Sequence, residues 1–342
     1  MVRRKKWNRR RGDNRLETKA DYALIQDAHM DSNLTEPMAS NETGCLSDPP
    51  TFDSDHANSI ETQIGDITPT IAPTGPDAAR IFALVGATGG VGTTSIATQL
   101  AHELAMMATP QKTSRRRPVD PTVCLIDLDF ESGACAHHLD LLPSLTLEDL
   151  CGPPEQIDKA FTQALISTHE CGISLLAAPN IIGANSRVNP HTVMAMLDAA
   201  AELYETVIID LPRYFQPWTL SVMRAVDVLG LTCELTIPSL HAARQSLEKL
   251  SALPHGQVNA NIILSKFERR SFKNTLRLTD AEKALGQSVL TTLCLDPDTT
   301  REALNCGEPA GVIRPDSRFV KDVRKLAEAL KTTKSTPLSK VA

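Results

Sequence analysis

The sequence ALVGATGGVGTTSIA, residues 83–97, places a glycine-rich turn between an apolar run and a helical pattern. The apolar run IFALVG, residues 81–86, is continuous and ends at a glycine, which is typical of a parallel strand covered on both faces. From Thr94 to Met107, apolar residues recur at the spacing of one helix face. A strand, a glycine turn and a helix in this order are the structural context of a phosphate-binding loop.

The glycines of this turn allow backbone N–H groups to point inward, where they can donate hydrogen bonds to phosphate oxygens. The following helix adds the positive end of its dipole, and Thr94 occupies the hydroxyl position that ligates Mg²⁺. The alternative is a glycine-rich turn that only packs against the sheet. The residues predicted to hold a nucleotide in this loop are Gly86, Thr88, Gly89, Gly90, Val91, Gly92, Thr93, Thr94 and Ser95.

The loop lacks the lysine of the GxxxxGK[ST] pattern, because Thr93 stands at the lysine position. A charge-assisted hydrogen bond contributes about 1.5–3 kcal/mol, so we expect a missing lysine to weaken nucleotide binding about tenfold to a hundredfold or more. Hydrolysis should suffer further, since phosphoryl transfer depends on neutralising charge at the leaving oxygen. Arg213 and Arg115–Arg117 are candidates for a substitute cation; the alternative is that these arginines are only solvated.

Carboxylates follow two further strands predicted from apolar runs, at residues 122–129 and 206–212. Ligands of open α/β sheets bind beyond the carboxyl ends of the strands, so these carboxylates should lie near the loop. We predict that Asp127 is catalytic and orients a water, and that Asp129 and Asp210 contribute to the nucleotide site. Aspartates that merely cap helices are the alternative for each taken singly. The predicted Mg²⁺ ligands are Thr94, Asp127 and Asp210, the aspartates through water.

The rest of the chain alternates apolar strand patterns with helical patterns. Such alternation predicts an α/β protein with a doubly wound, mostly parallel sheet and helices on both of its faces. The further predicted strands are 172–179, 226–233, 259–266 and 288–295, and the further predicted helices are 155–168, 191–204, 217–225, 239–252, 279–285, 299–306 and 317–331.

The N-terminal part has a different composition. Residues 1–12 hold seven Arg or Lys and no acid, whereas residues 13–78 are strongly acidic and poor in large aliphatic side chains. Such a segment cannot bury enough surface to offset its ordering entropy, so we predict a disordered tail over 1–78, an α/β domain over 79–331 and a flexible tail over 332–342. The sequence contains no run of 18 apolar residues, so it predicts no membrane-spanning helix. The eight scattered cysteines, without a CxxC pair, fit a reducing cytoplasm.

Several segments resemble known proteins. GATGGVGTTSIATQLA, residues 86–101, resembles the deviant Walker A loop, KGGxGK[ST], of the MinD/ParA ATPase superfamily. Residues 124–150, residues 207–250 with their DLP, WTL and SLHAAR segments, and residues 301–309 resemble the CpaE/TadZ branch of pilus assembly proteins. The resemblance covers about residues 80–330. It implies a MinD-like fold, binding of ATP and Mg²⁺, homodimerisation, and a role at the cell pole in assembly of Flp/Tad (type IVb) pili.

The sequence also departs from that family, since its signature lysine falls at Thr88 and its loop lysine at Thr93. We therefore expect a dimeric polar scaffold with a degenerate ATP site and weak or no hydrolysis. Its partners would be the pilus secretion ATPase and platform proteins on the cytoplasmic side of the inner membrane. The alternatives are an active MinD/ParA-type ATPase that cycles at the membrane, and a partition protein that binds DNA through residues 3–11, although nucleic acid is the less favoured partner.

Three other features have two interpretations each. The basic N-terminus, which includes Trp7, is either an anchor for an anionic membrane surface or a solvated tail. The apolar stripe of the helix at 317–331 favours packing on the domain over membrane targeting. His137 and His138, beside Cys135, are interpreted as loop surface and not as a metal site, because no further ligands follow at suitable spacing.

Overall fold

A computed structural model describes residues 79–108, 121–253, 258–268 and 276–333. The predicted tail 1–78 and residues 334–342 of the predicted C-terminal tail lie outside the described residues. The described chain forms an eight-stranded sheet of order β3-β4-β2-β5-β1-β6-β7-β8, in which only the β3–β4 pair is antiparallel. The strands are β1 Arg80–Gly86, β2 Val123–Asp127, β3 Ser167–Thr168, β4 Ser174–Leu176, β5 Thr206–Leu211, β6 Val228–Glu234, β7 Ala260–Phe267 and β8 Val289–Cys294.

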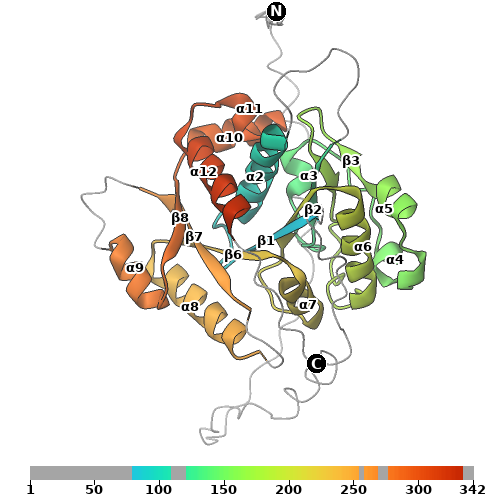
Figure 1. The fold of residues 1–342 in the computed structure, drawn as a ribbon, viewed down its shortest axis with the longest axis horizontal. Helices are drawn as coiled ribbons and strands as arrows, with labels where there is room; N and C mark the ends of the chain where they lie inside the picture. The colour runs from blue at the N-terminus through green and yellow to red at the C-terminus, as the bar shows by residue number, and fades with distance from the viewer. Residues whose placement is uncertain (1–78, 109–120, 254–257, 269–275, 334–342) are drawn as a thin grey trace, which may run out of the picture. The chain divides into compact units, whose positions relative to one another are not determined.

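Helices cover both faces of the sheet (Figure 1). One face carries α2 Thr93–Ala108, α3 Cys135–His138, α10 Pro297–Cys306, α11 Ala310–Ile313 and α12 Arg318–Thr332. The other face carries α4 Leu147–Cys151, the 3-10 turn η1 Pro154–Gln156, α5 Lys159–Leu165, α6 Pro190–Leu203, α7 Pro217–Ala225, α8 Ile237–Ser251 and α9 Leu278–Leu285.

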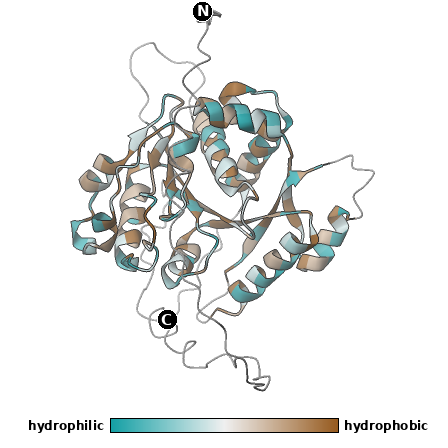
Figure 2. Cartoon of the chain, turned by 180° about the vertical axis from the view of Figure 1, so that it is seen from behind, coloured by the Kyte–Doolittle hydropathy of each residue, from teal (hydrophilic) through white to brown (hydrophobic). Residues whose placement is uncertain are grey.

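The central strand β1 shows why the sheet needs both layers. Ile81, Ala83 and Val85 pack into the core under α6–α9, while Phe82 and Leu84 pack into the core under α2 and α12. A strand with apolar side chains on both faces is stable only where helices exclude water from both. The covering helices carry both hydrophilic and hydrophobic residues, as expected for elements with one face on a core (Figure 2). The predicted doubly wound, mostly parallel α/β fold is confirmed.

The main differences from the predicted elements lie at the β3 edge of the sheet. The predicted strand 172–179 is reduced to β4, and the predicted helix 155–168 is divided among η1, α5 and β3. Helix α5 begins late because Asp158 is its N-cap and accepts a hydrogen bond from the Phe161 backbone N–H at 2.7 Å. A two-residue antiparallel strand such as β3 has too little sequence to show a period.

The last helix, α12, packs on the domain. Its apolar stripe is buried against α2 and β8, with none of the five side chains more than 6% exposed: Phe319, Val320, Val323, Leu326 and Leu330. The sequence interpretation that favoured packing over membrane targeting is therefore confirmed. Among the described helices, none combines the length and the hydrophobicity of a membrane span.

Candidate functional site

The loop between β1 and α2 is shaped by its glycines. Gly90 and Gly92 have φ of 76° and 86°, in the left-handed region that favours glycine. A side chain at Gly86 would bring its Cβ to 2.8 Å from Thr93 Oγ1, so the strand end and the helix start approach closely. The spacing of the GxxxxGK[ST] pattern, counted back from Thr93, puts its first glycine position at Ala87, so the sequence departs from the pattern there as well as at the lysine.

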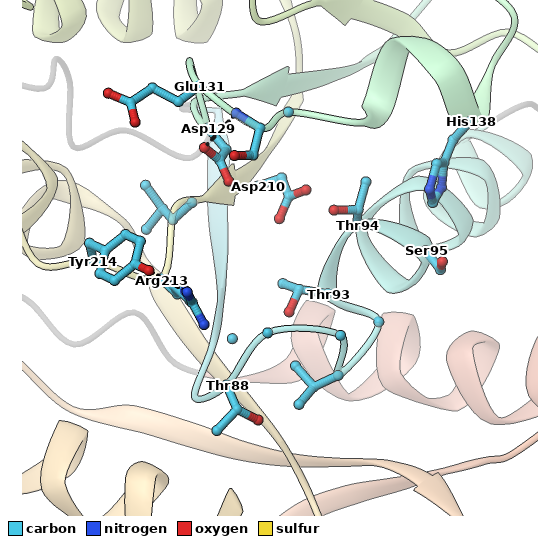
Figure 3. A pocket seen from close by; sticks show the side chains of 18 of the residues that line it. Thr88, Thr93, Thr94, Ser95, Asp129, Glu131, His138, Asp210, Arg213 and Tyr214 are labelled. Carbon is cyan, nitrogen blue, oxygen red and sulfur yellow. Dashed lines mark hydrogen bonds between the residues drawn. The ribbon is translucent and has the colours of Figure 1, made fainter. Parts of the chain in front are cut away.

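A cavity of about 530 Å³ opens in front of this loop, at the carboxyl ends of β1, β2 and β5 (Figure 3). This volume falls within the range of small-molecule sites. Every predicted nucleotide-binding residue of the loop lines the cavity, together with Asp129 and Asp210. The sequence analysis did not place the following lining residues at the site: Glu131, Ser132, Gly133, His138, Asn185, Leu211 and Tyr214.

Asp127 and Asp210 lie side by side at the base of the site, because β2 and β5 are neighbours and the two residues are register partners. Both are almost fully buried. Burial raises the pKa of each carboxyl, and for Asp210 the nearby Asp127 carboxylate raises the pKa further. Two adjacent buried carboxylates disfavour their own ionisation unless a cation compensates them.

The chemistry of these side chains fits a hard divalent cation. The Thr94 side chain makes a hydrogen bond with Asp210, so a hydroxyl and a carboxylate meet at the start of α2 (Figure 3). Asp127, Cys135 and Asp210 each offer a ligand atom, and these atoms lie within 4.8 Å of one another. Burial raises the pKa of the Cys135 thiol, so it stays protonated and is no ligand for Mg²⁺. The residues that fit Mg²⁺ are therefore Thr94 and the two aspartates.

Asp127 does not line the cavity itself. Its Oδ1 accepts a hydrogen bond from the Asp129 backbone N–H at 3.1 Å, and its Oδ2 accepts one from the Cys135 backbone N–H at 3.0 Å. These bonds hold the segment between β2 and α3 in place. Asp129 is half-buried and lines the cavity, so it is the better placed of the two to contact a water or a phosphate. The catalytic role of Asp127 stays a prediction.

Two basic side chains from other parts of the fold lie close to the loop. Arg213 lines the cavity, whereas Lys266, at the end of β7, donates to the Gly90 carbonyl at 2.6 Å and pairs with Glu234 at 2.8 Å. Arg213 was a candidate in the sequence analysis, whereas no sequence pattern pointed to Lys266, which lies on a strand distant in the chain. The other candidates, Arg115–Arg117, lie outside the described residues.

His138 corrects one sequence interpretation. We expected His137 and His138 to be loop surface, but His138 is half-buried and lines the cavity near Ser95 (Figure 3). Burial and, to a smaller extent, the neighbouring His137 lower the pKa of His138 to about 4. The imidazole is therefore neutral at pH 7 and cannot replace the missing lysine charge, although it can still exchange hydrogen bonds.

Comparison with solved structures supports the fold. No model of a protein family matches the sequence, and no curated protein matches it. A ParA family ATPase from Chlorobium tepidum is similar in structure, with a TM-score of 0.64 and 21% identity over 74% of this chain and 98% of that one. The cell division ATPase MinD of Pyrococcus furiosus has a TM-score of 0.59 and 20% identity, over 74% of this chain and 98% of that one.

A third similar structure is MinD from Pyrococcus horikoshii complexed with Mg-ADP, with a TM-score of 0.58 and 19% identity over 74% of this chain and 96% of that one. At these identities the likeness is one of fold. The chain thus has the fold of MinD and ParA ATPases, with a glycine loop and carboxylates at the carboxyl edge of the sheet.

Proposed function

We propose that this protein binds an adenine nucleotide with Mg²⁺ in the cavity at the β1–α2 loop. The observation that carries this proposal is the loop geometry: left-handed glycines at 90 and 92 border a cavity that also contains Thr94 and Asp210. The backbone N–H groups of the loop would orient the phosphates. Thr94, with Asp210 and Asp127 through water, would hold Mg²⁺, which neutralises phosphate charge when bound. The Mg-ADP complex of a protein with this fold supports the choice of ligand.

We further propose that the protein is a CpaE/TadZ-like organiser of Flp/Tad pilus assembly. The resemblance of residues 124–150, 207–250 and 301–309 to that branch supports this role. The protein would form a homodimer at the cell pole, on the cytoplasmic side of the inner membrane. There it would recruit the secretion ATPase and the platform proteins of the pilus, and hydrolysis would be weak because the loop has no lysine.

Nucleotide binding is tested by titrating the full-length protein with a fluorescent ATP analogue, with and without Mg²⁺. We expect saturable, Mg²⁺-dependent binding below millimolar nucleotide. No binding at millimolar nucleotide would exclude the proposal. The pilus role is tested separately, by fluorescence microscopy of a tagged protein and by counting pili on cells that lack it. A uniform cytoplasmic signal together with normal pili would contradict the organiser role.

Arg213 favours a second candidate function, an active MinD/ParA-type ATPase, because it brings a positive charge into the cavity. Phosphate release by the purified protein separates the two candidates. Turnover equal to that of lysine-containing relatives, and lost in Asp127→Ala, would support the ATPase and overturn the scaffold with a degenerate site. Circular dichroism of the variant should accompany this assay, since Asp127 also holds backbone N–H groups.

A further inference from the structure

The cavity at the β1–α2 loop contains an arginine at the side opposite α2. Arg213 follows β5 and extends toward the turn that carries Thr88 (Figure 3). Its Nη1 atom lies 3.1 Å from the position that a Cβ would take at Gly89. The guanidinium therefore lies against the loop at Gly89, where a side chain would force it to shift.

Arg213 is held in this place by a neighbouring aromatic ring, and the carboxylate of Asp129 lies near enough to interact with it electrostatically. Its guanidinium carbon lies 4.5 Å from the ring centroid of Tyr214, and it also donates a hydrogen bond to the Tyr214 hydroxyl. In the part of the chain that the structure describes, no carboxylate forms a salt bridge with it. Cation–π contact orients the group and leaves N–H donors free for an anion.

The charges of the residues that line the cavity distinguish this arginine from its neighbours. Among the described residues that line the cavity, Arg213 is the one lysine or arginine, against Asp129, Glu131 and Asp210. Lys266 is already engaged with the Gly90 carbonyl and Glu234 and does not line the cavity.

We propose that Arg213 replaces the missing loop lysine in cis, as the phosphate-binding cation of this site. The inference rests on the proposed nucleotide binding. A guanidinium can donate two parallel hydrogen bonds to a phosphate group, so Arg213 would contribute to binding of the nucleotide. The loop then keeps its backbone donors, while the charge comes from the end of β5 instead of the start of α2.

The test compares Mg²⁺-dependent binding of a fluorescent ATP analogue to full-length variants. Arg213→Ala should weaken binding roughly tenfold or more, and Arg213→Lys by less, since a lysine keeps the charge but loses the bidentate geometry. Arg301→Ala removes the same charge from an exposed site on α10 and should leave the affinity unchanged. Adding Thr93→Lys to Arg213→Ala should restore most of the affinity, because it returns a cation to the loop.

Equal affinity of wild type and Arg213→Ala would overturn the inference while leaving nucleotide binding intact. A loss in Arg301→Ala as large as in Arg213→Ala would also overturn it, since net charge would then explain the effect. Failure of Thr93→Lys to restore any affinity would contradict the replacement of one cation by another. If the wild type itself binds no nucleotide, the proposed function fails first. Unchanged thermal unfolding of each variant shows that the fold is retained.

Discussion

At the scale of single residues, the buried pair Asp127 and Asp210 links stability to pH. Both carboxyls have a raised pKa, first because they are buried and then because they lie next to other carboxylates. An aspartate in an unfolded chain has a pKa of about 3.9. The folded protein therefore binds protons more strongly, and the free energy of unfolding falls as the pH rises from about 4 through the raised pKa values.

We predict that Asp210→Asn makes the ligand-free protein more stable than wild type at pH 8 and brings the two closer together at pH 4. Each unit of raised pKa corresponds to about 1.4 kcal/mol, so a gain of at least about 1 kcal/mol at pH 8 is expected. Urea unfolding at the two pH values measures it. Glu155→Gln, at an exposed carboxyl on η1, is the control. If Asp210→Asn is no more stable than wild type at pH 8, the two buried carboxyls do not lower the free energy of unfolding at that pH.

The sequence predicts the acids and the loop glycines because each follows an apolar run or fits a known spacing. It does not reveal that Lys266 contacts Gly90, since the two residues lie 176 positions apart. The half-burial of His138 also has no local signal, because it depends on the helices that pack around α3. Short-range pattern thus identifies candidate residues, while the orientation of each side chain depends on tertiary contacts.

At the scale of elements, α2 and α12 are joined by a buried charge. Glu103 of α2 is 2% exposed, and its carboxylate accepts hydrogen bonds from Arg324 Nε at 2.7 Å and from Gln99 Nε2 at 2.8 Å. Gln99 in turn accepts a hydrogen bond from the Gly311 backbone N–H at 2.8 Å. This network joins α2 to α11 and α12, the first and the last two helices of the described residues.

Arg324→Ala should lower the free energy of unfolding by about 1–3 kcal/mol, because the carboxylate of Glu103 would stay buried with fewer partners. The Arg324 side chain is 44% exposed, so the effect should fall below that of a fully buried pair. Chemical denaturation measures the change. Combining Arg324→Met with Glu103→Gln should recover most of the loss, since the charge is then removed along with its partner. A single variant within about 0.3 kcal/mol of wild type would contradict this role.

The apolar stripe of α12 leads to a different expectation. Leu326→Ala removes a fully buried side chain and should destabilise the protein by about 2–5 kcal/mol. It should not change binding to vesicles, since the stripe is covered by α2 and β8. Thermal unfolding and vesicle sedimentation measure the two effects. Weaker sedimentation with an unchanged melting temperature would instead identify α12 as a membrane element.

Most helices and strands could be predicted, because the sequence shows long apolar runs for the strands and helical spacing of apolar residues for the helices. The predicted helices at 191–204 and 217–225, for example, correspond to α6 and α7. Elements of four or five residues, such as α3 and α4, were missed since they contain about one turn and show no period.

At the scale of the whole molecule, the strand order explains why a site forms. Neighbours β2, β5 and β1 are parallel, so their carboxyl ends bring Asp127, Asp210 and Gly86 to one edge of the sheet. The crossover helices cover the two faces of the sheet (Figure 1). In this topology, a change of sequence in the loops after β1, β2 and β5 alters the chemistry of the site and not the fold. A threonine in place of the lysine of the pattern at position 93 therefore leaves the architecture unaffected.

The last prediction concerns the N-terminal segment. Both core clusters of the described residues come from the chain between Ile81 and Leu330. We therefore expect a variant comprising residues 79–342 to unfold within about 2 °C of the full-length protein, since a terminal segment that the sequence predicts to be disordered should contribute little to stability. Vesicles with anionic lipid should bind the full-length protein and not this variant. The attraction of seven basic residues in 1–12 to an anionic surface should weaken as salt is added.

A variant that lacks only residues 1–12 separates charge from length, because it keeps the acidic segment 13–78. It should bind anionic vesicles as poorly as the 79–342 variant, and neutral vesicles should bind none of the three proteins. Full binding after loss of residues 1–12 would place the membrane contact elsewhere. Steep salt-dependent binding to DNA by the full-length protein, lost with residues 1–12, would instead favour the partition alternative, since such a slope reports counterions released from phosphates.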